Sequence, residues 1–302
     1  MTNLHLMITG ATGYIGSRLV LAANRKGHRL TLLVRAPGES GDKPDVRWFP
    51  WSLEETPPAE AFAQSGEFGP VDALIHLAHQ WTSSRFEPDD ENLTGTATLI
   101  EAARAAGIPR TVYGSTVSAR KDALNRYGRN KWAVEQLFEP PGGVSARIGL
   151  VYGGIETGQW GALSEMVSRL PLLPVPGARA LVQPIHIDEV CTGLLTLAER
   201  PALSKAFYGL AAPDPIAFGQ FLKHVARYRF NRKLRIFSVP IWLALIGARL
   251  TSILPFVPTV DRERVLGVAG IQTMKTAADL VELEVLPEDL EKNLVALNLS
   301  TP

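Results

Sequence analysis

Cysteine is almost absent from this chain of 302 residues. The one cysteine, Cys191, lies in the apolar-rich stretch DEVCTGLLTLA. A single cysteine excludes both an internal disulfide and a cysteine metal cluster, and no other metal site is predicted. Its apolar neighbours predict a buried structural thiol rather than a reactive one.

An excess of charge of either sign is also missing. Lys and Arg number 31, Asp and Glu number 30, and the net charge is +1. No basic run or basic helix stripe stands out, so the composition argues against a nucleic-acid partner. Apolar residues make up 46% and charged residues 20%, a balance typical of a globular enzyme with a substantial core.

Long hydrophobic runs are limited to residues 236–260, which carry a single charge, Arg249. Pro240 and Pro255 leave about 14 residues between them for a helix, too few to span a bilayer. We expect a core helix here; contact with a membrane surface, or a groove for a lipid-bearing substrate, is the alternative. The N-terminus MTNLHLMITG lacks the pattern of a signal peptide, which favours a cytoplasmic location.

Strands and helices alternate through the first half of the chain. Apolar strands are predicted at 4–9, 29–34, 45–51, 71–78, 110–116 and 144–153. Strands that are apolar throughout, separated by helices, predict an α/β fold with a Rossmann-type doubly wound parallel sheet. Glycines and prolines become frequent after about residue 155. We therefore predict a first domain over 1–155, built on the Rossmann-type sheet, and a smaller C-terminal substrate-binding portion over 156–302, interleaved with the first.

The motif TGATGYIG places Gly10, Gly13 and Gly16 where the first strand becomes the first helix. A tight turn needs the first glycine, and close approach of a dinucleotide pyrophosphate needs the second. The third lets the helix pack on the sheet with its N-terminus facing the phosphates. This turn predicts a bound NAD(P).

The end of the second strand reads LLVRAP, with Arg35 and no acid until Glu39. An acid at this place suits the ribose 2′-hydroxyl of NAD, whereas an arginine suits the 2′-phosphate of NADP. Arg18, early in the first helix, is a second candidate for the same region. We therefore predict NADP in preference to NAD, with a solvated strand-end arginine as the alternative.

With these motifs the chain resembles the extended short-chain dehydrogenase/reductases, a family of NAD(P)-dependent epimerases and dehydratases. The resemblance runs from residue 4 to about 200. It depends on TGATGYIG and on six further stretches in the same order: LIHLAH (74–79), ENLTGTATLIEAA (91–103), YGSTVS (113–118), YGRNK (127–131), ARIGLVYGG (146–154) and QPIHIDEV (183–190).

The resemblance implies a catalytic set. Tyr127 would be the proton-transfer group, and Lys131, one helical turn away, would hold the ribose and favour the phenolate. Thr116 would orient the substrate, with Ser115 as the fallback, and Asn92 would support the lysine, directly or through a water. The expected cofactor-binding residues are Gly10, Thr12, Gly13, Tyr14, Ile15, Gly16, Arg35, Leu77, Ala78, His79 and Lys131.

Two departures from the family pattern concern recognition. Ser52 stands where an aspartate often reads the adenine, and Val182 stands where many nucleotide-sugar enzymes have an arginine. Arg179, Arg262 and Arg264 are candidate substitutes, and His79 is a candidate substrate contact beside Thr116, Tyr127 and Arg179.

The resemblance thus implies an oxidoreductase or epimerase acting on a small-molecule substrate, with a nucleotide sugar favoured. The alternatives are an NADPH-dependent reductase of a small ketone or lipid-like substrate, and a non-catalytic NADP(H)-binding sensor. A homodimer is also among the expected states.

Overall fold

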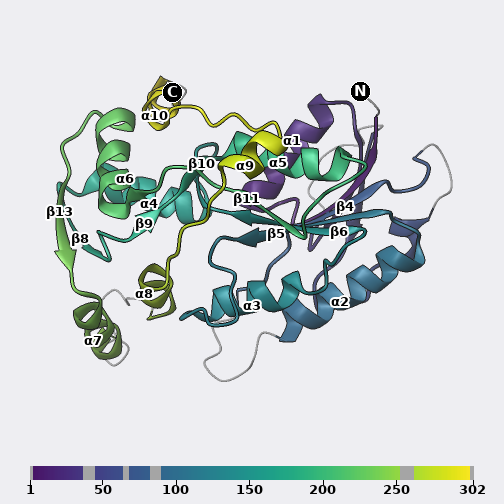
Figure 1. The fold of residues 1–302 in the computed structure, drawn as a ribbon, viewed down its shortest axis with the longest axis horizontal. Helices are drawn as coiled ribbons and strands as arrows, with labels where there is room; N and C mark the ends of the chain where they lie inside the picture. Colours follow the sequence, from purple (N-terminus) through teal and green to yellow (C-terminus); the bar gives the residue numbers. More distant parts are fainter. Residues whose placement is uncertain (1–2, 37–44, 64–67, 82–89, 252–261, 300–302) are drawn as a thin grey trace.

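A seven-stranded parallel sheet forms the centre of the molecule (Figure 1). The computed structural model describes residues 3–36, 45–63, 68–81, 90–251 and 262–299. The strand order is β11-β6-β5-β4-β1-β2-β3, and every neighbouring pair is parallel. The bounds are β1 (His5–Thr9), β2 (Arg29–Val34), β3 (Val46–Pro50), β4 (Ala73–His76), β5 (Arg110–Thr116), β6 (Gly143–Ile148) and β11 (Phe207–Leu210).

Helices cover both faces of this sheet, as the apolar strands predicted (Figure 1). On one face, α1 (Tyr14–Arg25) and α5 (Ile187–Glu199) bury Leu19, Ala23 and Leu194 in a core with β1, β2 and β6. On the other face, α2 (Asp90–Ala105) and α3 (Arg126–Glu135) bury Leu99 and Val134. The α/β Rossmann-type prediction is confirmed, and Cys191 on α5 is buried as expected.

The sixth strand is shorter than the predicted 144–153, because the chain changes partners at Gly149. The Gly149 amide donates to Leu210 O at 2.9 Å, whereas the Leu150 amide donates to Gln183 O at 3.0 Å. A side chain at Gly149 would overlap the Gln183 carbonyl. Residues beyond this point form β7 (Leu150–Tyr152), which pairs with β10 (Pro184–His186) in a separate two-stranded sheet.

The two portions of the chain are interleaved. Strand β11 and helix α5 come from the second half of the sequence, yet they complete the central sheet and one of its helical layers. Leu280 and Leu283 of this half join the core of the central sheet. The remaining elements of this half lie outside that sheet, and several of them enclose a second core around Trp160, Tyr152 and Phe221. They are α4 (Gly158–Arg169), β8 (Leu172–Pro176), β9 (Leu181–Val182), β12 (Ile216–Ala217), α6 (Phe218–His224), a π-helical turn (Val225–Arg229), β13 (Arg235–Val239), α7 (Ile241–Thr251), α8 (Arg262–Ala269), α9 (Ala277–Glu282) and α10 (Leu290–Leu299); a short 3-10 helix (Ala59–Phe62) belongs to the first half.

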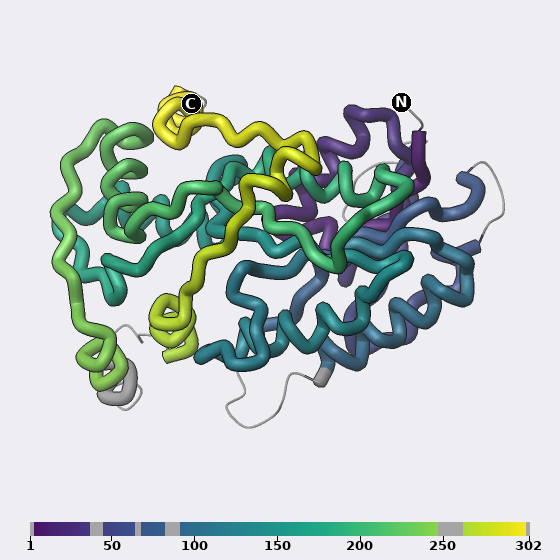
Figure 2. The backbone as a smooth tube through the Cα atoms, in the orientation of Figure 1, coloured from purple at the N-terminus to yellow at the C-terminus, as the bar shows by residue number. Residues whose placement is uncertain are grey.

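The C-terminal segment ties the two portions together. From α8 it runs back across the molecule, past β11 and α9, to α10 (Figure 2). The Thr276 hydroxyl donates to Ala211 O at 2.7 Å, and Asp279 accepts from the Gly209 amide at 2.7 Å. These contacts fix the edge strand β11 and the loop that follows it.

The expected core helix within 236–260 is wrong for the part that the structure describes. On α7, Trp242 is 64% exposed, and Leu243 and Ile246 are also exposed, while only Ala244 is buried among the side chains described there. Residues 252–260 lie outside the described residues. Within the described ranges, no helix combines the length and apolar character that a membrane span requires.

Candidate active site

The glycine turn after β1 (Gly10–Gly16) packs against the backbone of the loop that follows β4. Gly10 has φ +68°, and a side chain there would lie 2.7 Å from the amide nitrogen of Ala78. Gly16 is packed against Gly10 O, so a side chain would overlap that carbonyl. Helix α1 begins at Tyr14, with Gly13 as an N-cap that has no side-chain cap bond and with no acid in the first turn. These features fit a dinucleotide diphosphate at the helix N-terminus.

The loop after β4 is held in place by two buried polar side chains. The Thr9 hydroxyl oxygen accepts from the amides of Leu77 and Ala78, both at 3.2 Å. Asn92 on α2 accepts from the Gln80 amide at 2.8 Å and donates to Gln80 O at 2.9 Å. The hydrogen bonds of the Asn92 side chain are therefore with this loop. The expected support of Lys131 by Asn92 stays a prediction.

Helix α3 carries the tyrosine–lysine pair. It begins after Asn125, whose side chain accepts from the Gly128 amide at 3.3 Å. Gly128 lets the turn after β5 approach, because a side chain there would lie 2.6 Å from Ser118 O. Lys131 is buried, and its Nζ donates to Gly114 O at 2.8 Å while lying 5.8 Å from the Tyr127 ring centroid.

Two aromatic side chains from the loop after β4 enclose Tyr127. Trp81 stacks on the phenol ring, with centroids 4.9 Å apart and an interplanar angle of 13°. His79 meets the same ring edge-on at 5.3 Å. Trp81 is 76% exposed, so an apolar indole faces solvent directly above the candidate acid/base. His79 therefore lies against Tyr127, and its contact with a substrate stays a prediction.

Burial displaces the pKa values of the pair in opposite directions, away from each other. It raises the pKa of Tyr127 to about 12 and lowers the pKa of Lys131 to about 7, a shift that Glu135 opposes in part. Burial, with help from Lys131, also lowers the pKa of His79 to about 2. The expectation that the ammonium favours phenolate is wrong for the protein alone: desolvation dominates, and the phenol keeps its proton at neutral pH.

The two candidate hydroxyls at the end of β5 have different surroundings. Ser115 Oγ is buried and has no hydrogen-bond partner among the described residues. Thr116 is half-buried, and its Oγ1 accepts from the Ser118 amide at 3.3 Å, which leaves the hydroxyl proton free to donate. The strand alternation places Ser115 on the face of Tyr113 and Thr116 on the opposite face.

The arginines considered for recognition occupy separate places. Arg35 is exposed directly after β2, where a 2′-phosphate reader is expected. Arg18 is held by Asp188 of α5 through two hydrogen bonds, of 2.5 and 2.8 Å. Arg179 is exposed in the turn between β8 and β9. Arg262 pairs with Glu263 at 3.5 Å.

The two departures from the family pattern have structural explanations. Val182 is buried in the second core, where an arginine would have to be desolvated. The Ser52 amide, rather than its hydroxyl, is engaged: it donates to Glu55 at 3.0 Å in the turn after β3.

Sequence reasoning missed three residues that shape the site. Trp81 follows the LIHLAH motif by two positions, and an indole next to a predicted cofactor loop was the available signal. Gly128 was visible as the small residue inside YGRNK. Thr9, at the end of the first strand, looked like an ordinary strand residue, and only the pairing of β1 with β4 reveals its contacts to the loop after β4.

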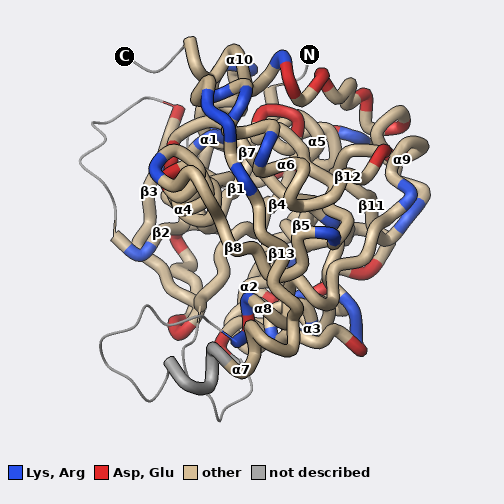
Figure 3. Tube along the Cα trace, turned by 90° about the vertical axis from the view of Figure 1, so that its left-hand side faces the viewer, with Lys and Arg blue, Asp and Glu red and all other residues tan. Residues whose placement is uncertain are grey.

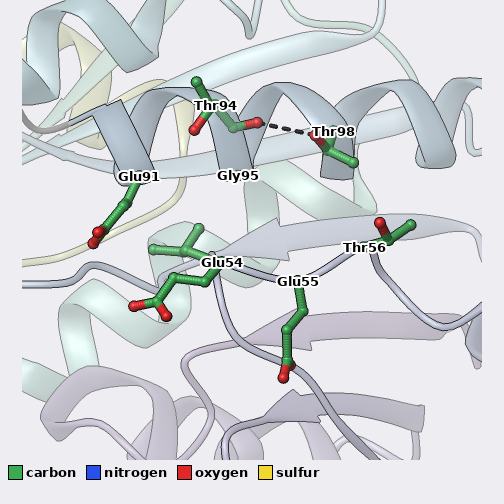
Figure 4. A pocket seen from close by; sticks show the side chains of 8 residues that line it. Glu54, Glu55, Thr56, Glu91, Thr94, Gly95 and Thr98 are labelled. Carbon is green, nitrogen blue, oxygen red and sulfur yellow. Dashed lines mark hydrogen bonds between the residues drawn. The ribbon is translucent and has the colours of Figure 1, made fainter.

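A shallow cavity of about 340 Å³ lies beside this site, between the turn after β3 and α2 (Figure 4). Its lining includes Glu54, Glu55 and Glu91, and the Gln80 side chain donates to Glu54 and Glu91 at 2.8 and 3.1 Å. Three carboxylates disfavour a phosphate ligand, and the cavity does not include Tyr127.

A parallel Rossmann sheet, a glycine turn at a helix N-terminus and a half-buried tyrosine beside a buried lysine are the features of a dinucleotide-dependent oxidoreductase. The family model described as NAD dependent epimerase/dehydratase family matches residues 6–207. The chain therefore belongs to the NAD-dependent epimerase/dehydratase family.

Individual relatives differ in what they act on. A ceramide reductase of Caulobacter vibrioides is 31% identical over 243 residues, covering 77% of this chain and 73% of that protein. A 4-hydroxy-2-methyl-3-oxo-4-farnesyl-3,4-dihydroquinoline-1-oxide ketoreductase of Stigmatella aurantiaca is 26% identical over 82% of this chain and 79% of that protein. The human epimerase family protein SDR39U1, solved with NADPH, has a TM-score of 0.74 at 18% identity, over 99% of this chain and 100% of that one.

The depressed pKa of Lys131 predicts a particular pH dependence of stability. Unfolded lysine titrates near about 10.4, so between about pH 7 and that value the unfolded chain binds more protons. The free energy of unfolding of the free protein should therefore rise with pH, by up to about 1.4 kcal/mol per pH unit from this group. Lys131→Met should flatten that rise between about pH 7 and pH 9, measured by urea unfolding.

The matched control is Lys292→Met, which removes an exposed lysine of α10 and should leave the slope unchanged. Parallel profiles for wild type and Lys131→Met would show that Lys131 is not desolvated in solution.

The hydroxyls at the end of β5 make a second prediction. We expect Thr116→Val to lower kcat about 100-fold, the usual cost of one lost hydrogen-bond donor to a developing oxyanion. Ser115→Ala should have a smaller effect because Ser115 Oγ is buried beside the strand. Steady-state kinetics of both variants, with Thr116→Ser as the conservative rescue, make the comparison; a larger loss for Ser115→Ala would transfer the role to Ser115.

Proposed function

We propose that this protein is an NAD(P)H-dependent ketoreductase acting on the carbonyl group of an apolar, lipid-like substrate. The proposal is based on the surroundings of Tyr127. Burial raises the pKa of its phenol, so the phenol stays protonated, and the exposed indole of Trp81 stacks on its ring. Carbonyl reduction needs a proton donor, and a neutral phenol supplies one. The aromatic cover favours an apolar partner over a phosphorylated one.

The relatives support this choice. Their names describe a ceramide reductase and a farnesylated-quinoline ketoreductase, which act on molecules with long apolar parts. Support for a nucleotide sugar is weaker at this site, since Val182 is buried in the position of the family arginine and Arg262 is paired with Glu263. Nucleotide sugars stay in the substrate screen as the competing class.

The chain's own residues divide the work of the reaction. A bound reduced nicotinamide supplies a hydride to the carbonyl carbon. The glycine turn at Gly10–Gly16 would hold the diphosphate at the start of α1, and Arg35 would bind the 2′-phosphate of NADP(H). Tyr127 gives its phenolic proton to the carbonyl oxygen, and Thr116 donates a hydrogen bond to the same oxygen. Lys131, fixed on Gly114 O, holds the ribose and stabilises the phenolate that remains.

The proton-transfer step is tested by Tyr127→Phe, which keeps the ring and its stacking on Trp81 but removes the hydroxyl. Turnover should fall about 10²- to 10⁴-fold, the usual span for a positioned acid/base, while cofactor affinity changes little. The measurement is NAD(P)H oxidation with a panel of long-chain ketones, small ketones and nucleotide sugars, beside cofactor titration.

The control is Tyr228→Phe, which removes a phenol from the π-helical turn of the second core, outside the site. Undiminished turnover in Tyr127→Phe would contradict the catalytic assignment. A wild-type protein that binds cofactor but reduces no member of the panel would favour the sensor alternative instead. Turnover of nucleotide sugars alone would reject the apolar substrate class.

Cofactor preference is tested separately at Arg35. Arg35→Ala should weaken NADPH binding about 10- to 150-fold, because a charge-assisted contact is worth about 1.5–3 kcal/mol, and should change NADH binding little. Isothermal titration with both cofactors measures the difference. The matched control is Arg25→Ala, an exposed arginine in the last turn of α1. Equal weakening of both cofactors would remove the basis for NADP specificity.

A further inference from the structure

The second half of the chain contains a long stretch without acidic residues. Between Asp214 and Asp261 there is no Asp or Glu, although the chain as a whole is balanced. The same stretch holds seven basic residues, which are Lys223, Arg227, Arg229, Arg232, Lys233, Arg235 and Arg249. The prediction that the sequence has no basic run is therefore wrong for this stretch. The net charge of the whole chain does not reveal it, because acidic residues elsewhere balance these cations.

Most of this charge lies on the surface. Lys223, Arg227, Arg232, Lys233 and Arg235 are all exposed. Arg229 differs, since it is buried and paired with Glu156 at 2.6 Å. In the described part of the chain, no carboxylate lies within ion-pair distance of the five exposed cations. Their charge is thus available to an external anionic partner.

The two-stranded sheet of β8 and β13 presents apolar side chains to solvent next to these cations. The strands are parallel, with Leu172 opposite Arg235 and Pro174 opposite Phe237. Leu173, Val175 and Ile236 point into the second core, so the alternation turns the other set outward. Phe237 is 63% exposed and Leu172 is 57% exposed.

Helix α7 extends this surface. Figure 1 shows β13 leading directly into α7 at one end of the molecule, and Figure 3 views that end with β8, β13 and α7 in front. Trp242, Leu243 and Ile246 are exposed on α7. We call the set formed by Leu172, Pro174, Arg235, Phe237, Trp242, Leu243 and Ile246, with the neighbouring Arg232 and Lys233, the basic apolar face.

We propose that the basic apolar face docks on the surface of a bilayer that contains anionic lipids. The combination of exposed aromatic and aliphatic side chains with unpaired cations, and no acid in the same stretch, matches the chemistry of the headgroup region. Tryptophan and phenylalanine enter the interface, and Lys and Arg stay at the level of the phosphates. The absence of a long apolar helix in the described ranges fits contact with one leaflet surface rather than a span.

The charge pattern favours a bilayer over a second copy of the chain as the occupant. Two copies meeting through this face would bring two sets of unpaired cations together without an intervening acid. An anionic membrane surface, in contrast, attracts each nearby cation and attracts less as salt rises.

The test is flotation of the full chain with vesicles of phosphatidylcholine, with and without a phosphatidylglycerol fraction of about one third. Wild type should float with the anionic vesicles, and less so at high salt. Trp242→Ser and Phe237→Ser should each lower the partition coefficient about tenfold, as expected for an aromatic side chain that is buried only partly. Arg235→Glu should lower it at least about fivefold, the effect of one lost cation near the surface.

Matched controls come from exposed positions elsewhere. Leu286→Ser removes an exposed leucine, and Lys292→Glu reverses an exposed charge on α10; neither should change flotation. Melting curves establish that each variant is folded. Tryptophan emission should shift to the blue on vesicle binding, and the shift should shrink in Trp242→Phe although that variant still floats.

Three outcomes would overturn the proposal. Wild type could fail to float with anionic vesicles. Trp242→Ser could lose no more binding than Leu286→Ser. A dimer in solution that Trp242→Ser converts to monomer would show that a second copy of the chain covers the face instead.

Discussion

The site depends on a close approach between two backbone segments, the turn after β1 and the loop after β4. At Gly10 there is no room for a side chain, because Leu77 and Ala78 lie directly against it. The Thr9 hydroxyl then binds the amides of the same two residues. This contact sits between β1 and β4, where the strand order reverses and where open α/β sheets form their ligand crevice. Through the loop it also positions His79 and Trp81 over Tyr127.

Burial, rather than charge pairing, determines the electrostatics of the catalytic pair. Without a ligand, desolvation disfavours both the phenolate and the ammonium, so near pH 7 the phenol is neutral and the Lys131 amine is only about half protonated. A site in this state carries less charge than an exposed pair would and keeps a proton on the phenol. That arrangement suits a reaction in which the protein gives a proton to a carbonyl oxygen, and it makes the charge on Lys131 sensitive to what binds beside it.

The parts of the fold that depend on local pattern could be predicted from the sequence. The strands at 5–9, 29–34 and 110–116 could be predicted from their apolar and β-branched residues, and Gly27 and Gly107 end helices with positive φ as expected. Strand β11 was not predicted, because FYGL is too short to show a period and its partner β6 lies far away in sequence.

The surroundings of side chains were harder to predict for the same reason. Arg18 was a candidate for binding the cofactor, but in the structure it forms an ion pair with Asp188. The two residues are 170 positions apart, so no local sign of this contact was present in the sequence. The apolar composition of α7 suggested a core helix, but composition does not say which neighbours a helix will have. The tyrosine–lysine pair was identified correctly as one helical unit, whereas its pKa values follow from burial that only the packed structure determines.

Helix α8 connects the catalytic site to the basic apolar face. It packs against α7 on one side. On the other, Glu263 accepts from the Arg126 amide at 2.7 Å at the start of α3, and Gly267 lies against Asn125, the N-cap of that helix. Helix α8 thus contacts both α7 of the basic apolar face and the first turn of α3, the helix that carries Tyr127 and Lys131.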